Sequence, residues 1–116
     1  MSQPPHPVNG LNELVHQRVR LGILAIAAEA EQVDFGYLRG ALGLTDGNLS
    51  RHLQVLEQAK LIAVRKGYTG RRPRTWVRIT AKGRKALDTE LAALRTLIAQ
   101  LDRSQAVRPD HGDNHA

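Results

Sequence analysis

The chain has 116 residues, with 17 lysines and arginines against 11 aspartates and glutamates, and it has no cysteine. This length fits one domain, and the absence of cysteine excludes disulfide bonds, thiolate metal sites and a cysteine nucleophile. A formal charge of +6 on so short a chain favours a polyanionic partner, most often nucleic acid.

The sequence of the N-terminal part predicts a short arm followed by a helix. We expect residues 1–10 to be a disordered arm, because they are rich in proline and lack apolar periodicity. From Leu11 to Ala27, apolar residues recur at three- and four-residue spacing, which is typical of an amphipathic helix. Asn9 and Asn12 are alternative N-caps of this helix.

Two further helices, separated by a tight turn, come next. Asp34 is a candidate N-cap for a helix that stops at Gly43, and Thr45 is a candidate N-cap for a helix from Asp46 to about Lys60. Two helices joined by a short turn that contains glycine form a helix-turn-helix.

The second of these helices has two chemically different faces. Leu49, Leu53 and Leu56 recur at i, i+4 and i+7, which predicts a buried face. The polar face of such a helix enters the major groove, where arginine reads guanine, asparagine or glutamine reads adenine, and hydroxyls suit phosphates. The alternative is an ordinary solvated face. The DNA-contacting residues that we predict on this helix are Thr45, Asn48, Ser50, Arg51 and Gln54.

A basic β-hairpin is predicted after the helix-turn-helix. Alternating strands over 62–66 and 75–79 flank a segment rich in glycine and proline, so we expect a long basic tip over 67–74. Residues 58–87 contain no acidic side chain, so we expect that nothing nearby neutralises the arginines of the hairpin. Arginine is favoured in a narrow minor groove by the negative potential there. We expect Trp76 to pack within the hairpin. The DNA contacts that we predict on the hairpin are Lys66, Arg71, Arg72 and Arg74.

A last helix, capped by Thr80, is expected over residues 81–102, and residues 103–116 are expected to form a disordered tail. Leucine and isoleucine recur along this helix at a spacing of 4-3-4-3, which is a heptad-like seam. The preceding elements already fill the core of so small a domain, so we expect the seam to meet a second copy of the chain. The alternative is packing on the first helix of the same chain. The dimer-interface residues that we predict are Leu87, Leu91, Leu94, Ile98 and Leu101.

The order of elements predicts a mainly α fold with a small β-hairpin wing (α+β). It is a winged helix-turn-helix over residues 11–80 followed by a C-terminal dimerisation helix. Residues 48–62 resemble the recognition helix of MarR/ArsR-like winged-helix regulators, and residues 76–84 resemble their return strand. The wing over 70–74 is most similar to that of a small bacterial subgroup of stand-alone winged helices. The resemblance covers residues 11–101 and implies DNA binding.

The sequence therefore predicts a transcriptional regulator of double-stranded DNA. We expect a homodimer, a repressor that occludes a promoter by binding an inverted-repeat operator. The alternative is a winged-helix module for protein interaction or RNA binding. The resemblance also allows for an unidentified small-molecule effector, although four aromatic residues offer few walls for its pocket.

We expect neither catalysis nor a cofactor. The sequence has no phosphate-binding glycine-rich loop, no HExxH motif, no paired catalytic carboxylates and no nucleophile motif. It also lacks the cysteine pair and the acid–histidine set of ArsR metal sensors, so no metal site is predicted. The longest apolar run, over residues 23–28, is far shorter than the ~20 residues of a membrane span. We expect a cytoplasmic, nucleoid-associated protein without a membrane partner.

Overall fold

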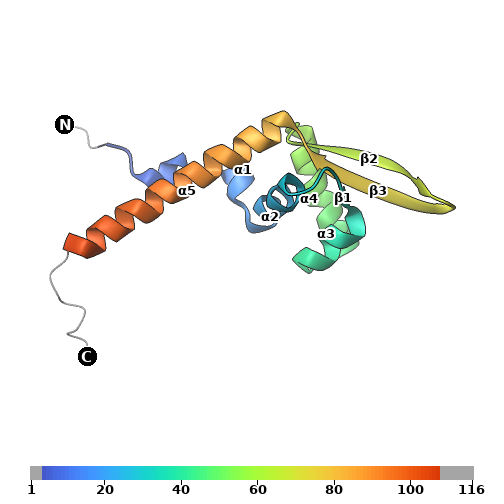
Figure 1. Ribbon diagram of the computed structural model, residues 1–116, viewed down its shortest axis with the longest axis horizontal. Helices are drawn as coiled ribbons and strands as arrows, with labels where there is room; N and C mark the ends of the chain where they lie inside the picture. The colour runs from blue at the N-terminus through green and yellow to red at the C-terminus, as the bar shows by residue number, and fades with distance from the viewer. Residues whose placement is uncertain (1–3, 108–116) are drawn as a thin grey trace, which may run out of the picture.

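Helices and one small antiparallel sheet make up residues 4–107, the part of the chain that the computed structural model describes. The sheet has the strand order β1-β3-β2 and lies at one end of the molecule, whereas the long helix α5 extends from the body toward the other end (Figure 1). The elements in chain order are η1 (Pro7–Gly10), α1 (Glu13–His16), α2 (Arg18–Ala28), β1 (Val33–Asp34), α3 (Phe35–Leu42), α4 (Asp46–Gln58), β2 (Ile62–Thr69), β3 (Arg72–Ile79) and α5 (Ala81–Val107).

The N-terminal part differs from the sequence prediction in two respects. Residues 7–10, expected to lie in a disordered arm, form the 3-10 turn η1 that runs beside α5 (Figure 1). The single helix expected from Leu11 is broken at Gln17, whose φ of −60° and ψ of 132° are extended. Asn12 caps α1, and the side chain of Gln17 caps α2 by accepting from the Arg20 N–H at 2.9 Å. A second cap inside the apolar stripe therefore divides one pattern into two helices.

The helix-turn-helix has the caps that the sequence predicts. The Asp34 carboxylate accepts the Tyr37 N–H at the start of α3, and the Thr45 hydroxyl accepts the Asn48 N–H at the start of α4. Between the two helices, Gly43 has a φ of +65°, a left-handed conformation that favours glycine. These local signals fix the turn that presents α4.

The hairpin is longer, and its turn is shorter, than predicted. Strands β2 and β3 stay paired as far as Thr69 and Arg72, so Gly70 and Arg71 alone form the turn. Gly70 has a φ of +64°, which a tight hairpin turn requires. Pro73 is tolerated in β3 because β1 pairs only with residues 76–77, so no strand borders that edge at Pro73. The predicted long loop over 67–74 was therefore wrong, and most of its basic residues lie on paired strands.

The core divides the predicted dimer seam into two parts. Leu87 is buried in the chain's own core at 5% exposure, and Leu91 is partly buried against the same core. Leu87 therefore faces the chain's own core and not a second copy, because α5 packs on α2 and on the N-terminal segment. The contact of Leu91 with a second copy stays a prediction. Farther along α5, Ile98 and Leu101 are 56% and 53% exposed.

Helix α5 continues to Val107, beyond the expected end at residue 102, and the part of the expected tail over 108–116 lies outside the described residues. Leu94, which lies between the two parts of the seam, is half-buried. Within residues 4–107, no helix combines the length and the apolar character needed to cross a membrane.

Candidate nucleic-acid interface

Helix α4 presents its polar face as the sequence predicts. Leu49, Leu53 and Leu56 are buried, so the helix is anchored to the core by one side. The hydroxyl of Thr45 accepts the backbone N–H of Asn48 at 3.1 Å, so the Thr45 side chain acts as the helix cap. The remaining predicted contact residues on α4 are all exposed, namely Asn48, Ser50, Arg51 and Gln54.

An ion pair joins the first turn of α4 to α3. The Arg39 guanidinium donates a hydrogen bond to the Asp46 carboxylate at 2.6 Å. This hydrogen bond and the negative charge of Asp46 raise the pKa of Arg39. A carboxylate in the first turn also interacts favourably with the helix dipole. The pair connects the two helices at the exposed end of α4.

A cleft of about 360 Å³ lies between α4 and the hairpin. Ser50 and Gln54 line it from α4, and Lys66 and Thr75 line it from the strands. Three of the predicted DNA-contacting residues, Ser50, Gln54 and Lys66, are thus brought together on one side of α4. The hairpin therefore borders this side of the helix.

The arginines of the hairpin differ in whether their side chains interact with other residues of the domain. Arg74 donates through Nε to the Asp34 carboxylate at 2.9 Å, and its guanidinium carbon lies 5.9 Å from the centroid of the Trp76 ring. Arg65 lies over the same ring at 4.4 Å and donates to the Gln32 side chain at 3.4 Å. Strand pairing brings Asp34 of β1 opposite Trp76. The expectation that nothing neutralises the hairpin arginines was therefore wrong for Arg74.

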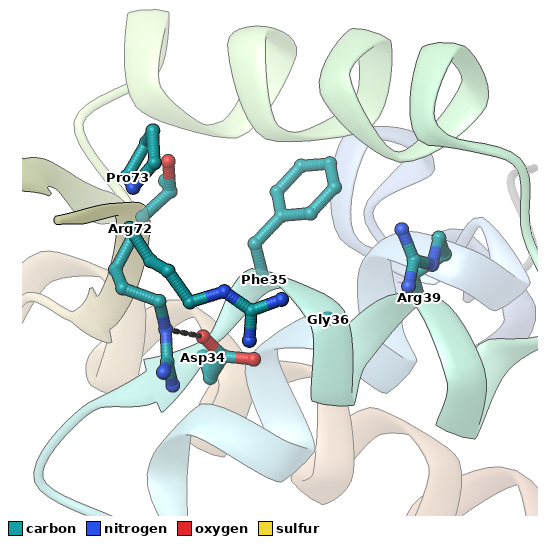
Figure 2. Close-up of a pocket in the computed structure, with 8 residues that line it drawn as sticks. Asp34, Phe35, Gly36, Arg39, Arg72 and Pro73 are labelled. Carbon is teal, nitrogen blue, oxygen red and sulfur yellow. Dashed lines mark hydrogen bonds and ion pairs between the residues drawn. The ribbon is translucent and has the colours of Figure 1, made fainter. Parts of the chain in front are cut away.

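The two arginines at the end of the hairpin, Arg71 and Arg72, form no ion pair within residues 4–107. Arg71 is exposed in the turn. Arg72 lines a cleft of about 580 Å³ between β3 and the start of α3. Figure 2 shows the Arg72 side chain reaching across this cleft toward Phe35, beside the Asp34 carboxylate. The cleft also contains the Arg39 side chain, so basic groups from α3 and β3 converge there.

The other side of α4 carries a basic cluster that the sequence did not reveal. His52 is half-buried, and its pKa is lowered by this burial and by the positive charges of Arg20 and Arg51. Arg20 belongs to α2, whereas Arg51 and His52 belong to α4. Because the two helices are distant in the sequence, neither spacing nor local charge predicts their proximity. Arg20 was therefore missing from the predicted contact residues.

A buried carboxylate connects the N-terminal segment to α5. Glu90 is 1% exposed, accepts the Asn12 N–H at 2.9 Å and lies 2.5 Å from Nδ1 of His16. A buried carboxylate needs such partners, because an unpaired polar group in the core is costly. Local sequence patterns do not predict this contact, because its residues are 74 and 78 positions apart in the chain. Over the described range, no group of three or more histidine and acidic side chains is placed to hold a metal.

The comparison with known proteins gives one family and several related structures. Residues 19–98 match the family model described as a winged helix DNA-binding domain. An uncharacterized protein from Methanocaldococcus jannaschii is 43% identical over 68 residues, which are 59% of this chain and 74% of that protein. A transcriptional regulator homologue from Pyrococcus horikoshii OT3 is 34% identical with a TM-score of 0.73, over 78% of this chain and 90% of that chain.

More distant structures share the fold alone. The Mycobacterium tuberculosis transcriptional regulator MOSR, solved in complex with DNA, is 23% identical with a TM-score of 0.65, over 84% of this chain and 70% of that chain. A putative MarR-family regulator from Enterococcus faecalis V583 is 20% identical with a TM-score of 0.66, over 87% of this chain and 90% of that chain.

Proposed function

The chain belongs to the winged helix DNA-binding domain family, and from this membership we propose that it regulates transcription by binding a specific sequence of double-stranded DNA. The family is one of DNA-binding domains rather than of enzymes. The observation that carries the proposal is the division of α4 into a buried leucine face and an exposed polar face beside a basic hairpin. A helix with these two faces fits the major groove while it stays anchored to the domain.

In this proposal the residues of α4 read the bases. Arg51 donates two hydrogen bonds to guanine, and Asn48 or Gln54 forms the corresponding pair with adenine. Ser50 and Thr45 contact phosphate oxygens, which position the helix without selecting a sequence. The exposure of these side chains supports the assignment.

The hairpin supplies charge, and its arginines have different roles. We assign Lys66, Arg71 and Arg72 to the phosphate backbone and the minor groove, because they are basic and form no ion pair with the described residues. Arg74 is tied to Asp34 and Trp76, so it acts by holding the hairpin in place.

The proposed oligomer is a homodimer formed through the distal half of α5. Val8, Ile98 and Leu101 are exposed apolar side chains of η1 and α5, and η1 packs beside α5. Two-fold symmetry places two recognition helices about 34–36 Å apart, one turn of DNA, on an inverted repeat. The dimer represses by occluding the promoter, in the cytoplasm with the nucleoid.

An unidentified small-molecule effector is a further partner in this proposal. The two clefts of about 580 and 360 Å³, which share Phe35 and Thr75 in their linings, have the volume of small-molecule sites. A ligand in either cleft would contact the hairpin and so alter its position relative to α4.

A nuclease footprint on the DNA upstream of the protein's own gene tests the proposed function. We expect one protected inverted repeat whose half-sites are one helical turn apart, and protection that survives an excess of shuffled competitor. Protection that shuffled DNA removes equally would contradict sequence choice. Absence of binding to any duplex would favour the protein-interaction or RNA-binding alternative.

A further inference from the structure

A recognition helix in the major groove has a phosphate backbone on each side, because the groove is only about 12 Å wide. In this protein the hairpin borders one side of α4, where Ser50 and Gln54 share a cleft with Lys66. The opposite side of α4 packs on α2, which contributes Arg20 near His52. The two sides are therefore built from different elements of the chain.

The Arg20 side chain has an unsatisfied hydrogen-bond donor and no anionic partner among residues 4–107. Its Nε atom is buried without a hydrogen-bond partner among residues 4–107, although the side chain as a whole is half-exposed. A buried donor without an acceptor is unfavourable, and such groups are rare in folded proteins. Arg20 also lines an open cavity of about 620 Å³ with Glu13, yet no ion pair joins the two.

Positive charge gathers near His52, on the side of α4 that packs on α2. The charges of Arg20 and Arg51 both act on His52, and no carboxylate is among the groups that perturb it. Neither arginine forms an ion pair within the described part of the chain. Two guanidinium groups and one imidazole thus converge from α2 and α4 onto one side of the recognition helix.

We propose that Arg20, together with His52, binds the DNA backbone phosphate on the side of α4 opposite the hairpin. This inference rests on the proposed DNA binding and adds a second contact element to it. Helix α2 and the hairpin then hold the two strands that border the major groove. A phosphate diester would pair with the accessible part of the Arg20 side chain, which forms no ion pair among residues 4–107. Charge-assisted hydrogen bonds of this kind are stronger than neutral ones.

The test compares Arg20→Gln and Arg20→Lys with the wild-type chain in DNA binding at several salt concentrations. Arg20→Gln should weaken operator and shuffled DNA equally, about tenfold, and should lower the slope of log K against log salt by about one. Arg20→Lys keeps the charge and should keep the slope. Arg95→Ala removes a charge from an exposed position on α5 and should change neither quantity.

A folded Arg20→Gln variant with the wild-type affinity and slope would overturn the phosphate contact. A wild-type chain that binds no duplex at all would instead overturn the proposed function itself, so the two failures are distinguishable.

Ethylation interference gives a second measurement on the wild-type protein, which does not depend on the folding of a variant. We expect ethylated phosphates to block binding on both borders of the major groove in each half-site. Interference confined to the border that faces the hairpin would contradict the proposal.

Discussion

The two ends of the molecule carry surfaces of opposite character. The winged end exposes Asn48, Arg51 and Gln54 on α4. Its hairpin carries Arg71 and Arg72, which form no ion pair with the residues that the structure describes. The other end, the distal half of α5 with η1 at its side, exposes apolar side chains instead (Figure 1). A polar and basic surface fits a polyanion, whereas an apolar surface favours a protein partner. We infer from this difference that one region recognises DNA and that the other pairs two copies of the chain.

The largest expected effect comes from the apolar end. Ile98→Glu with Leu101→Glu should yield monomers, because charged side chains would have to be buried in the interface. Operator affinity should fall about 100-fold or more, since linked half-site binding is lost. Sedimentation and fluorescence anisotropy measure both effects.

The matched control is Ala92→Glu with Thr96→Glu, which adds the same charge at exposed positions on the other side of α5. This variant should remain dimeric. A stable dimer of the Ile98 and Leu101 variant would show that the apolar end has another role.

The next effect tests base reading at the winged end. Arg51→Ala should cost about 1–3 kcal/mol on the operator and should relax the preference at one base pair. Gln58→Ala, at the end of α4 and also exposed, should leave binding unchanged. Equal weakening of operator and random DNA by Arg51→Ala would identify Arg51 as a phosphate contact.

A smaller effect should separate two arginines of one strand. Arg72→Ala should lower the salt slope by about one without loss of thermal stability. Arg74→Ala should instead lower stability by about 0.5–1 kcal/mol, because it breaks the ion pair with Asp34. Melting curves and salt titrations of both variants are needed. Identical behaviour of the two variants would contradict the distinction between tied and untied arginines.

The smallest effect concerns pH. Partial burial and the positive charges of Arg20 and Arg51 lower the pKa of His52 in the folded protein. Below the ordinary pKa near 6.5 the unfolded chain therefore takes up the proton first, so stability falls as the pH falls through that range. His52→Gln should show a slightly smaller loss of melting temperature between about pH 7 and pH 5. An unchanged pH profile would show that His52 is not coupled to these charges.

Local sequence signals predicted the elements that α4 depends on. Asp34, Gly43 and Thr45 act through hydrogen bonds or backbone conformations of their immediate neighbours, so they can be identified without the fold. The leucine spacing of α4 is equally local. The same reasoning failed at Gln17, because a glutamine cap inside an apolar stripe is a weak signal.

Contacts between distant segments could not be predicted. Arg74 has no acidic residue near it in the sequence, but strand pairing brings Asp34 beside it in the fold. Arg20 and His52 meet only because α2 packs on α4. On α5 the heptad spacing was read correctly as an apolar seam, but spacing alone does not show that Leu87 faces the chain's own core.

We propose that α4 selects the DNA sequence, whereas the hairpin tip contributes positive charge. The direct test measures the affinity of the wild-type chain and of an Arg71→Ala, Arg72→Ala double variant for operator and shuffled DNA over a salt series. The double variant should lower the salt slope by about two and keep the ratio of operator to shuffled affinity. A ratio that falls toward one, or a slope that stays unchanged, would contradict this division of roles between α4 and the hairpin.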